Sequence, residues 1–376
     1  HSMKTSSFLS INRWLPITAN YIRSQMDNWP LDQQQVLADQ LVEPMPETPT
    51  VHFKNAFHPS LFNRIGRMVT STKNDLFRAQ KLSAVSSESK ILISHFGNRG
   101  FADLGLPVNK HIVRFYGYDL HRLPFEDPEW LPKYNQLFIS VHKLWVEGPS
   151  MKSELIKLGA DSEKIRVLPL GTNLPKQLPI WRKKKNTFNI LIAGTFKEKK
   201  GILDALFVVK RLLEKGENIK VHLVGNEINA TSTDREYAAQ ISEVLKSDTL
   251  KQNVVLHGIL PKQALQKVAE LCQIGFLPSK WAKNRDCEGG YPVLFLDVMA
   301  TGLPLLTTNH CDIPFIVTKE CGWLVNEGDL NALETELMHI IYSDELTAKS
   351  EASYNQVKHH FTWDMLKPLY QDEIAL

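Results

Sequence analysis

The sequence predicts an α/β protein built from two Rossmann-like lobes, and three observations support this fold class. Short apolar strands alternate with helical segments through both halves of the chain, a pattern typical of parallel sheets. A polar stretch with two prolines, at 175–187, interrupts the pattern once, as linkers between domains do. A glycine-rich segment at 286–304 leads into a helix. Two such lobes predict a cleft between them, with ligands at the carboxyl ends of the strands.

The composition narrows the class of protein. A chain of 376 residues is long enough for two domains. It carries 44 Lys and Arg against 41 Asp and Glu, so its charge gives no reason to expect a nucleic acid partner. None of its four cysteines forms a C-x-x-C pair, so we expect neither a disulfide framework nor a zinc site, which fits a cytoplasmic location. No apolar run reaches the roughly 20 residues of a spanning helix, and no signal peptide is expected.

The first lobe is expected to begin with a strand and to alternate from there. The expected strands are 7–11, 90–95, 112–115, 136–141 and 165–168, and the expected helices run through Tyr21 to Met26 and through Leu155 to Leu158.

The second lobe restarts the alternation after the proposed linker. The expected strands are 189–194, 220–225, 254–256, 274–277, 304–308 and 323–325, and the expected helices are 202–215, 237–245, 265–271, one after the glycine loop, 331–341 and 346–361.

The glycine-rich segment carries two carboxylates at informative places. Glu288 stands directly before the Gly289-Gly290 pair, and Asp297 follows nine residues later inside an apolar helical pattern. Glycines allow a ligand to approach the backbone, and free amides at a helix start favour anions. Carboxylates suit sugar hydroxyls better than phosphate, so the segment predicts a site for a phosphorylated sugar rather than for ATP with magnesium. An ordinary strand-to-helix turn is the alternative.

A lysine cluster lies at another strand-to-helix junction, in G-T-F-K-E-K-K-G at 194–201. Point charges beside a helix start suit a diphosphate, and the turn falls at the carboxyl end of a strand. A solvated basic turn is the alternative.

These two segments resemble the donor-site elements of the retaining glycosyltransferases of family 4, which have the GT-B fold. Glu288 matches the family's first acid, and Asp297 stands where the family usually has Glu. Lys200 matches the phosphate-binding lysine, whereas Thr195 occupies the usual arginine position, so Lys197 is expected to supply the missing charge. The resemblance implies a bacterial polysaccharide-type hexosyltransferase whose C-terminal helix crosses back to the first lobe.

The resemblance is looser in the first lobe. Tyr116 replaces the histidine of a strand-end motif that contacts the donor sugar, and His95 lies in an H-F-G element at an earlier strand end. Thr18 belongs to a loop that faces the donor phosphates in the family, although Ala19 removes that loop's acid. Thr18, His95 and Tyr116 are therefore expected to contact acceptor or sugar, with a purely structural His95 as the equal alternative.

The implied reaction moves a hexose from a nucleotide-diphosphate sugar, such as UDP-glucose, to a glycan or lipid-linked saccharide acceptor in polysaccharide biosynthesis. Lys200, Lys197 and Glu288 are expected to be catalytic, Lys200 and Lys197 by stabilising the leaving diphosphate and Glu288 by orienting the sugar. The expected donor-binding set is Gly194, Thr195, Lys197, Lys200, Glu288, Gly289, Gly290, Tyr291, Pro292, Val293, Leu294 and Asp297. No cofactor and no metal are expected, because no D-x-D motif follows a strand.

Two alternatives stay open from the sequence. A non-catalytic GT-B subunit that binds nucleotide or glycan as a partner would explain the departures at Thr195, Tyr116 and Ala19. The lysines at 183–185 are either a solvated part of the linker or a contact with the inner face of a membrane. The expected domains are 3–174 plus 360–376, a linker at 175–187, and 188–359.

Overall fold

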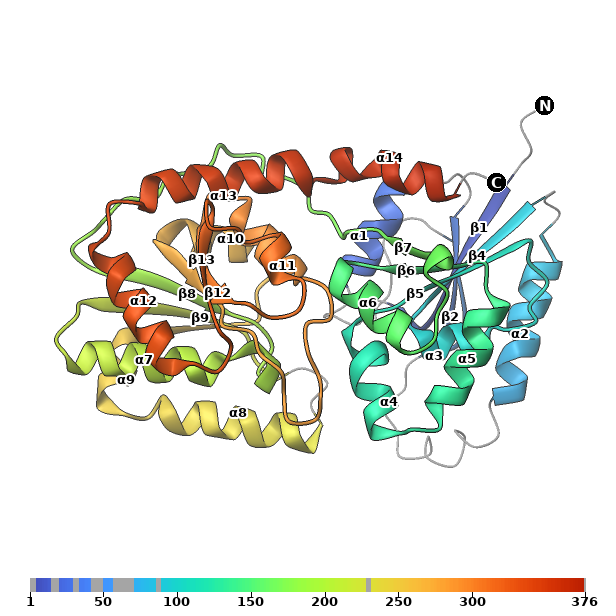
Figure 1. Cartoon of the computed structure of the whole chain (residues 1–376), viewed down its shortest axis with the longest axis horizontal. Helices are drawn as coiled ribbons and strands as arrows, with labels where there is room; N and C mark the ends of the chain where they lie inside the picture. Colours follow the sequence, from blue (N-terminus) through green and yellow to red (C-terminus); the bar gives the residue numbers. More distant parts are fainter. Residues whose placement is uncertain are drawn as a thin grey trace. The chain divides into compact units, whose positions relative to one another are not determined.

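The computed structural model describes residues 5–14, 20–29, 34–41, 50–56, 71–85, 89–227 and 231–374 (Figure 1). The chain forms two compact units. Unit 1 comprises His1–Pro169 with Lys367–Leu376, and unit 2 comprises Leu170–Leu366. The division falls at Leu170, so the stretch at 175–187 that the sequence suggested as a linker belongs to unit 2. The last residues of the chain return to unit 1.

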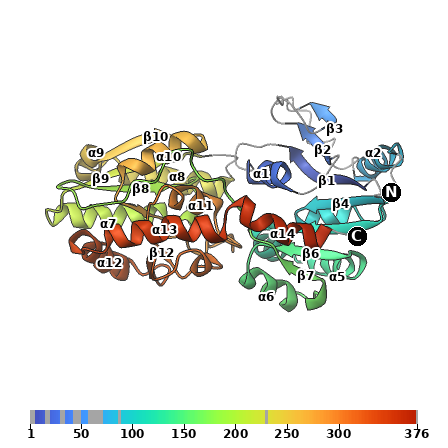
Figure 2. The same ribbon diagram turned by 90° about the horizontal axis from the view of Figure 1, so that it is seen from above.

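Unit 1 is built on a parallel sheet of seven strands in the order β3-β2-β1-β4-β5-β6-β7. Figure 2 labels β3, β2, β1 and β4 and, beyond helix α14, β6 and β7 in this succession. The order reverses direction at β1, which is the doubly wound arrangement of Rossmann-like domains. The strands are β1 (Thr5–Trp14), β2 (Gln34–Leu41), β3 (Thr50–Ala56), β4 (Ser89–His95), β5 (Lys110–Arg114), β6 (Lys143–Val146) and β7 (Ile165–Val167).

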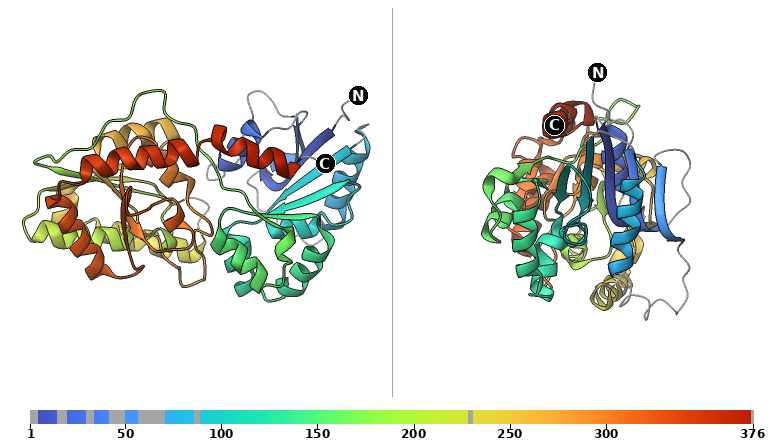
Figure 3. Two further views of the ribbon diagram at one scale, coloured as in Figure 1. Left: turned by 45° about the horizontal axis from the view of Figure 1, so that its top comes forward. Right: turned by 90° about the vertical axis from the view of Figure 1, so that its right-hand side faces the viewer.

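Helices and short turns connect these strands. In Figure 3 the green helices between residues 123 and 157 lie together on one side of the teal strands. The helices are α1 (Asn20–Asn28), α2 (Ser71–Ser83), α3 (Gly97–Ala102), α4 (Leu123–Glu126), α5 (Trp130–Ser140) and α6 (Pro149–Lys157), with single turns at Tyr118–Arg122 and Ser162–Lys164. The last helix, α14 (Trp363–Ile374), begins in unit 2 and ends in unit 1.

The strand expected at 136–141 is wrong, because these residues belong to helix α5 and its end. Tyr134, Leu137, Phe138 and Val141 recur at helical spacing, and all four are buried in one core with β5, β6 and β7. A short apolar run fits a buried helix as well as a strand. Here the helical spacing of the buried residues, and not an alternating pattern, corresponds to the structure. The strand itself follows at β6. The elements β2, β3 and α2 were not predicted.

Unit 2 has a second parallel sheet, of six strands, in the order β10-β9-β8-β11-β12-β13. The strands are β8 (Phe188–Ala193), β9 (Ile219–Val224), β10 (Val254–Gly258), β11 (Ile274–Phe276), β12 (Leu305–Thr308) and β13 (Gly322–Val325). The helices are α7 (Ile202–Glu214), α8 (Ser232–Val244), α9 (Asp248–Asn253), α10 (Lys262–Leu271), α11 (Val293–Met299), α12 (Leu330–Tyr342) and α13 (Leu346–His360).

Alternate residues of each strand in unit 2 point to opposite faces of the sheet. Ile190 and Ile192 of β8 pack in a core with α7, α8 and α12, whereas Leu191 and Ala193 pack in another core with α10, α11 and α13. Figure 1 shows these two sets of helices on opposite sides of the sheet. Because both faces are covered, the strands read as continuous apolar runs in the sequence. No helix in the described ranges is long and apolar enough to cross a membrane.

The turn between β8 and α7 depends on one glycine. Gly201 has φ +63° and immediately precedes the first residue of α7. A Cβ atom built on Gly201 would lie 1.9 Å from the carbonyl oxygen of Pro278, which follows β11. The close approach of these two backbones therefore leaves no room for a side chain.

We expect Gly201→Ala to destabilise unit 2 more than Gly216→Ala does. Gly216 also has a positive φ, +94°, but a Cβ there would meet no atom within 4 Å. The left-handed backbone costs an alanine about 1–2 kcal/mol at either position, and overpacking adds about 1–3 kcal/mol at Gly201. Urea unfolding of both variants measures the difference. Equal loss in the two would show that the contact with Pro278 does not constrain the turn.

Candidate functional site

The glycine turn after β8 positions a lysine beside the end of the sheet. Gly194 has φ +151°, and a Cβ there would lie 3.3 Å from Cγ of Lys200, so the lysine stem runs across the glycine. A single helical turn, Glu198–Lys200, then leads through Gly201 into α7. The strand-to-helix junction that the sequence predicted at this place is confirmed.

Lys200 makes an ion pair with Glu288, from a loop 88 residues further along the chain. Nζ of Lys200 lies 2.8 Å from Oε2 of Glu288, and the hydroxyl of Ser279 donates to Oε1 at 2.9 Å. The Glu288 side chain is only 4% exposed, against 19% for Lys200. Thus the structure brings together two residues that the sequence had singled out separately, on the carboxyl side of β8 and β11.

Glu288 is held in its charged form. Burial alone would raise the pKa of this carboxyl, but the Lys200 and Lys199 ammonium groups nearby outweigh burial and lower the pKa below its usual value. Glu288 is therefore a carboxylate at neutral pH, an acceptor without a proton to donate.

The neighbouring lysines are paired as well. Lys199 binds Asp286 Oδ1 at 3.1 Å and the Cys287 carbonyl at 2.9 Å, which fixes the backbone just before Glu288. Lys280 binds both carboxylate oxygens of Asp204, each at 2.8 Å. The sequence had given Lys199, Lys280 and Asp204 no role. Each of these two lysines is paired with a carboxylate, so the charges of the basic cluster are balanced pair by pair.

Lys197 points in another direction. Its Nζ lies 3.6 Å from Oδ2 of Asp234 in the first turn of α8. Asp234 also accepts a hydrogen bond from the Thr231 amide as part of a capping box. Lys197 thus stands near the start of α8, with a contact set different from that of Lys200. Thr195, at the position where the resembling family has arginine, carries no charge.

Asp297 lies on α11 with partners of its own. Its Oδ1 accepts from the Thr172 hydroxyl at 2.5 Å and lies 2.7 Å from the Lys262 ammonium group. Gln266 binds its backbone carbonyl at 3.1 Å. The two carboxylates of the segment therefore sit in separate surroundings, Glu288 with Lys200 and Ser279, Asp297 with Lys262 and Thr172. Lys262, a residue of α10, was not singled out from the sequence.

The segment between the two acids is a tight, buried turn. Gly289 has φ +76°, and Gly290 and Tyr291 are buried. The ring of Tyr291 packs on Phe361 with the ring centroids 5.4 Å apart. Pro292 precedes α11 without a side-chain cap, and Val293 and Leu294 open the helix. The predicted glycine loop and helix start are confirmed as elements of structure.

In unit 1, His95 and Tyr116 are hydrogen-bonded to each other. Nδ1 of His95 lies 2.6 Å from the Tyr116 hydroxyl, which also accepts from Gln25 at 3.2 Å. Trp29 stacks on His95 with ring centroids 6.0 Å apart. Burial, with Arg114 nearby, lowers the pKa of His95 well below its usual value, so its imidazole is neutral. Both side chains are buried. Thr18 and Ala19 lie outside the described residues.

A histidine behind Glu288 was missed in the sequence. The Glu288 amide donates to Nε2 of His310 at 3.2 Å, and Nδ1 of His310 lies 2.5 Å from Oε2 of Glu327. His310 follows β12, whose neighbour in the sheet is β11. The polar run T-T-N-H-C-D directly after a buried strand was the signal that could have revealed it.

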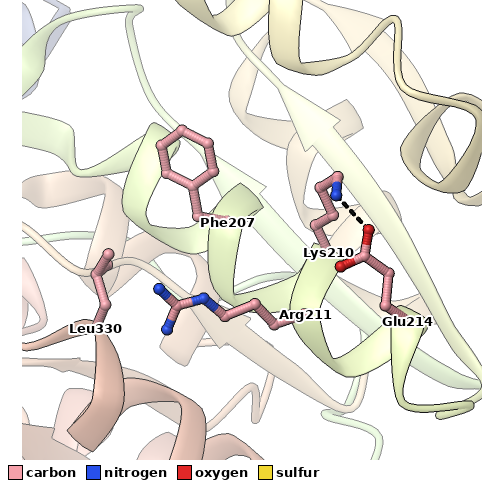
Figure 4. A pocket seen from close by; sticks show the side chains of 5 residues that line it. All are labelled: Phe207, Lys210, Arg211, Glu214 and Leu330. Atoms are coloured by element: carbon pink, nitrogen blue, oxygen red, sulfur yellow. Dashed lines mark hydrogen bonds and ion pairs between the residues drawn. The ribbon is translucent and has the colours of Figure 1, made fainter.

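A hollow elsewhere on unit 2 has a different chemistry. It lies between α7 and the start of α12 and is lined by Phe207, Lys210, Arg211, Glu214 and Leu330 (Figure 4). Lys210 pairs with Glu214 inside the hollow, and Arg211 pairs with Glu334 at 3.1 Å. None of the carboxylates or glycines of the candidate site lines it.

Comparison with known proteins identifies the domain that carries this site. Residues 175–356 match the sequence profile of the family described as glycosyl transferases group 1. This part of the chain is a glycosyltransferase group 1 domain. It contains Lys200, Glu288 and Asp297, and the chain is accordingly a transferase.

Individual relatives extend over more of the chain. The amylovoran biosynthesis glycosyltransferase AmsK of Erwinia amylovora is 27% identical over an alignment 286 residues long, which covers 71% of this chain and 67% of AmsK. The putative colanic acid biosynthesis glycosyltransferase WcaL of Escherichia coli K12 is 26% identical over an alignment 298 residues long, which covers 75% of this chain and 70% of WcaL.

The same fold occurs in Anabaena HepE, solved in complex with UDP and glucose. The two chains superpose with a TM-score of 0.73 at 11% identity, over 99% of each. The pair of parallel-sheet units is thus the GT-B fold, and the predicted fold class is confirmed.

We expect Lys200→Ala to destabilise the glycosyltransferase domain in a pH-dependent way. Because Glu288 has a lowered pKa in the folded state, its stabilising contribution is present above the unfolded pKa of about 4.3 and is lost as pH falls through the folded value. The difference in unfolding free energy between wild type and variant should therefore be largest near pH 7 and shrink below about pH 4.

Lys210→Ala is the control, because its pair with Glu214 is exposed on α7. It should change stability by less than about 0.5 kcal/mol at any pH. A difference for Lys200→Ala that is constant from pH 3 to pH 7 would contradict the assigned ion pair.

Proposed function

We propose that the chain is a retaining hexosyltransferase that uses a nucleotide-diphosphate sugar, and that unit 2 holds this donor. The observation that carries the proposal is the Lys200–Glu288 pair beside the glycine turn, inside a glycosyltransferase group 1 domain. A cation at a glycine-lined strand end suits a diphosphate. A buried carboxylate next to it suits the hydroxyls of the sugar.

A uridine nucleotide is the first donor to test, with glucose as the first sugar. HepE, which shares the fold, was solved with UDP and glucose. In the proposed site Gly194, Thr195 and Lys200 face the diphosphate from one side, and residues 289–294 face it from the other. Asp297, which lies on α11 with Lys262 and Thr172, is proposed to bind the ribose.

The acceptor is proposed to be a saccharide in exopolysaccharide biosynthesis, with a lipid-linked saccharide as a candidate. The names of AmsK and WcaL, which place them in amylovoran and colanic acid biosynthesis, support this class. We assign acceptor contacts to unit 1, where His95 and Tyr116, which are buried and hydrogen-bonded to each other, would support the contact surface from within the sheet.

The proposed chemistry is electrostatic. Breaking the bond between sugar and phosphate leaves positive charge on the sugar and negative charge on the diphosphate. The Lys200 ammonium group would turn from Glu288 toward the leaving phosphate, and this stabilises the transition state more than the ground state. Lys197, which lies 3.6 Å from Asp234 at the start of α8, would act as a second cation by leaving that carboxylate. The acceptor attacks from the face that the diphosphate leaves, and a phosphate oxygen takes its proton. Because the sequence has no D-x-D motif after a strand, these lysines take the place of a catalytic metal.

The second candidate is a non-catalytic subunit that binds nucleotide or glycan. It is favoured by Thr195, which leaves the place of the family's arginine uncharged, and by Tyr116, whose hydroxyl is engaged by His95. Slow hydrolysis of UDP-glucose separates the candidates. An enzyme releases glucose to water at a rate that scales with its concentration, whereas a pure binder releases none.

A cytoplasmic protein with peripheral contact to the inner face of a membrane is part of the proposal. Leu178 and Ile180 are 88% and 52% exposed, and Trp181 and the lysines at 183–185 follow them. Basic residues beside exposed apolar ones suit an anionic lipid surface. Sedimentation with phosphatidylserine vesicles tests this contact, and recovery of all the protein in the supernatant would argue against it.

Glu288→Gln and Asp297→Asn should act on different stages of the reaction. Glu288→Gln should reduce the rate of UDP-glucose hydrolysis more than it reduces the affinity for UDP. The reason is that the Glu288 carboxylate is proposed to face the sugar, where charge develops in the reaction. Asp297→Asn should weaken the binding of UDP itself by about tenfold or more, since a hydrogen bond to a charged group contributes about 1.5–3 kcal/mol and each 1.4 kcal/mol is tenfold in affinity.

Calorimetric titration of both variants with UDP, with hydrolysis measured alongside, checks these expectations. If Glu288→Gln loses affinity for UDP while Asp297→Asn keeps it, the two proposed roles are inverted. If neither variant differs from wild type, the loop is a structural turn and the donor site lies elsewhere.

A further inference from the structure

Two cysteines and a histidine lie close together beside the loop that carries Glu288. Cys287 directly precedes Glu288, and His310 and Cys311 follow β12. Because β11 and β12 pair in parallel, with Phe276 opposite Leu306, the segments after them meet at the same edge of the sheet. The two Sγ atoms and a ring nitrogen of His310 all lie within 4.8 Å of one another. We propose that Cys287, His310 and Cys311 bind a zinc ion.

The surroundings of the imidazole select the nitrogen that a metal would take. Nε2 of His310 faces the Glu288 amide at 3.2 Å, and Nδ1 lies 2.5 Å from Glu327. In the neutral ring the proton therefore belongs on Nδ1, and Nε2 is the nitrogen that a metal would bind once any proton on it has left. A carboxylate that binds the outer nitrogen of a histidine is the common arrangement around metal-bound imidazoles. Glu327 therefore positions the ring.

The distances suit a tetrahedral ion. Zinc bonds of about 2.3 Å to sulfur and 2.0–2.1 Å to nitrogen place ligand atoms about 3.6–3.8 Å apart. Sγ of Cys311 lies 3.3 Å from Nε2 of His310, close to this value, and the 4.8 Å limit on the whole group requires a contraction of about 1 Å at most.

The chemistry of the three ligands selects the metal. Two thiolates and one imidazole are soft or borderline ligands, which favour zinc over magnesium or calcium. On binding, the two thiols release their protons to solvent, and two thiolates balance the charge of Zn²⁺. Three protein ligands leave a fourth position for water.

The backbone supports the cluster from both sides. Cys311 has φ +47°, a conformation that is uncommon for residues other than glycine. On the other side, Lys199 binds the Cys287 carbonyl at 2.9 Å, and Asp286 accepts from the Cys287 amide at 3.0 Å. Cys287 is fully buried, while Cys311 is half-buried and gives an ion access from solvent.

Zinc would couple to the donor loop without taking part in the reaction. An ion that takes the Nε2 lone pair displaces the hydrogen bond from the Glu288 amide. It also ties the segment before Glu288 to the segment after β12. Zinc binding is therefore expected to order the loop that carries Glu288. The spacing of the cysteines gave no sign of this site, because α11 and β12 separate Cys287 from Cys311 in the chain.

The test uses the whole chain, stripped of metal with a chelator and dialysed against Zn²⁺ or Co²⁺. Wild type should bind one zinc ion per chain, and its cobalt form should show thiolate-to-cobalt charge-transfer absorption. Cys287→Ser and Cys311→Ser should each reduce the affinity for zinc at least tenfold. Cys272→Ser and Cys321→Ser are the matched controls, since these free cysteines are also buried but lie outside the cluster, and they should bind as wild type does. Glu327→Gln should keep the stoichiometry and weaken affinity by about 10–100-fold.

Three outcomes would overturn the proposal. The first is wild-type protein without zinc or charge-transfer absorption. The second is equal zinc binding by Cys287→Ser, Cys311→Ser and the controls. The third is a disulfide between Cys287 and Cys311 that forms under air even with zinc in excess. If a serine variant fails to fold, as judged by circular dichroism, the cobalt spectrum of wild type and the affinity of Glu327→Gln still decide.

Discussion

The candidate site depends on the ion pair between Lys200 and Glu288. It joins the turn after β8 to the loop after β11, and it crosses 88 residues of sequence. With the Glu288 side chain only 4% exposed, the carboxylate would be costly to bury without its cation. The pair therefore adds to the backbone hydrogen bond between these two segments, which runs from the Lys280 amide to the Lys199 carbonyl at 3.0 Å. It also leaves a cation that a phosphate can share, which is the basis of the proposed chemistry.

The parallel sheet of unit 2 explains why so many functional groups gather there. The neighbouring strands β8, β11 and β12 end at one edge, and their loops supply Lys200, Ser279, Glu288 and His310. Close approach of backbones at this edge requires Gly201, which leaves no room for a side chain against Pro278. Lysines and acids are paired at this edge, Lys200 with Glu288 and Lys199 with Asp286.

Much of this arrangement could be predicted from the sequence, because local signals agreed with the fold. The apolar run of β8, the glycines of its turn and the helical pattern of α7 all point the same way. Helix α5 was misread because a short apolar run does not separate the two periods. The contacts of Asp297 with Lys262, and of His310 with Cys287, could not be read from spacing. The packing of α10 on α11 brings the first pair together, and the pairing of β11 with β12 brings the second.

The central claim is that the nucleotide part of the donor binds unit 2 at the edge where β8 and β11 end. Hydrogen–deuterium exchange of the whole chain, with and without saturating UDP, tests it most directly. The account predicts slower exchange in peptides that cover 194–203 and 286–296, with little change in peptides that cover the hollow between α7 and α12. Protection confined to that hollow or to unit 1, or no protection at all, would contradict it.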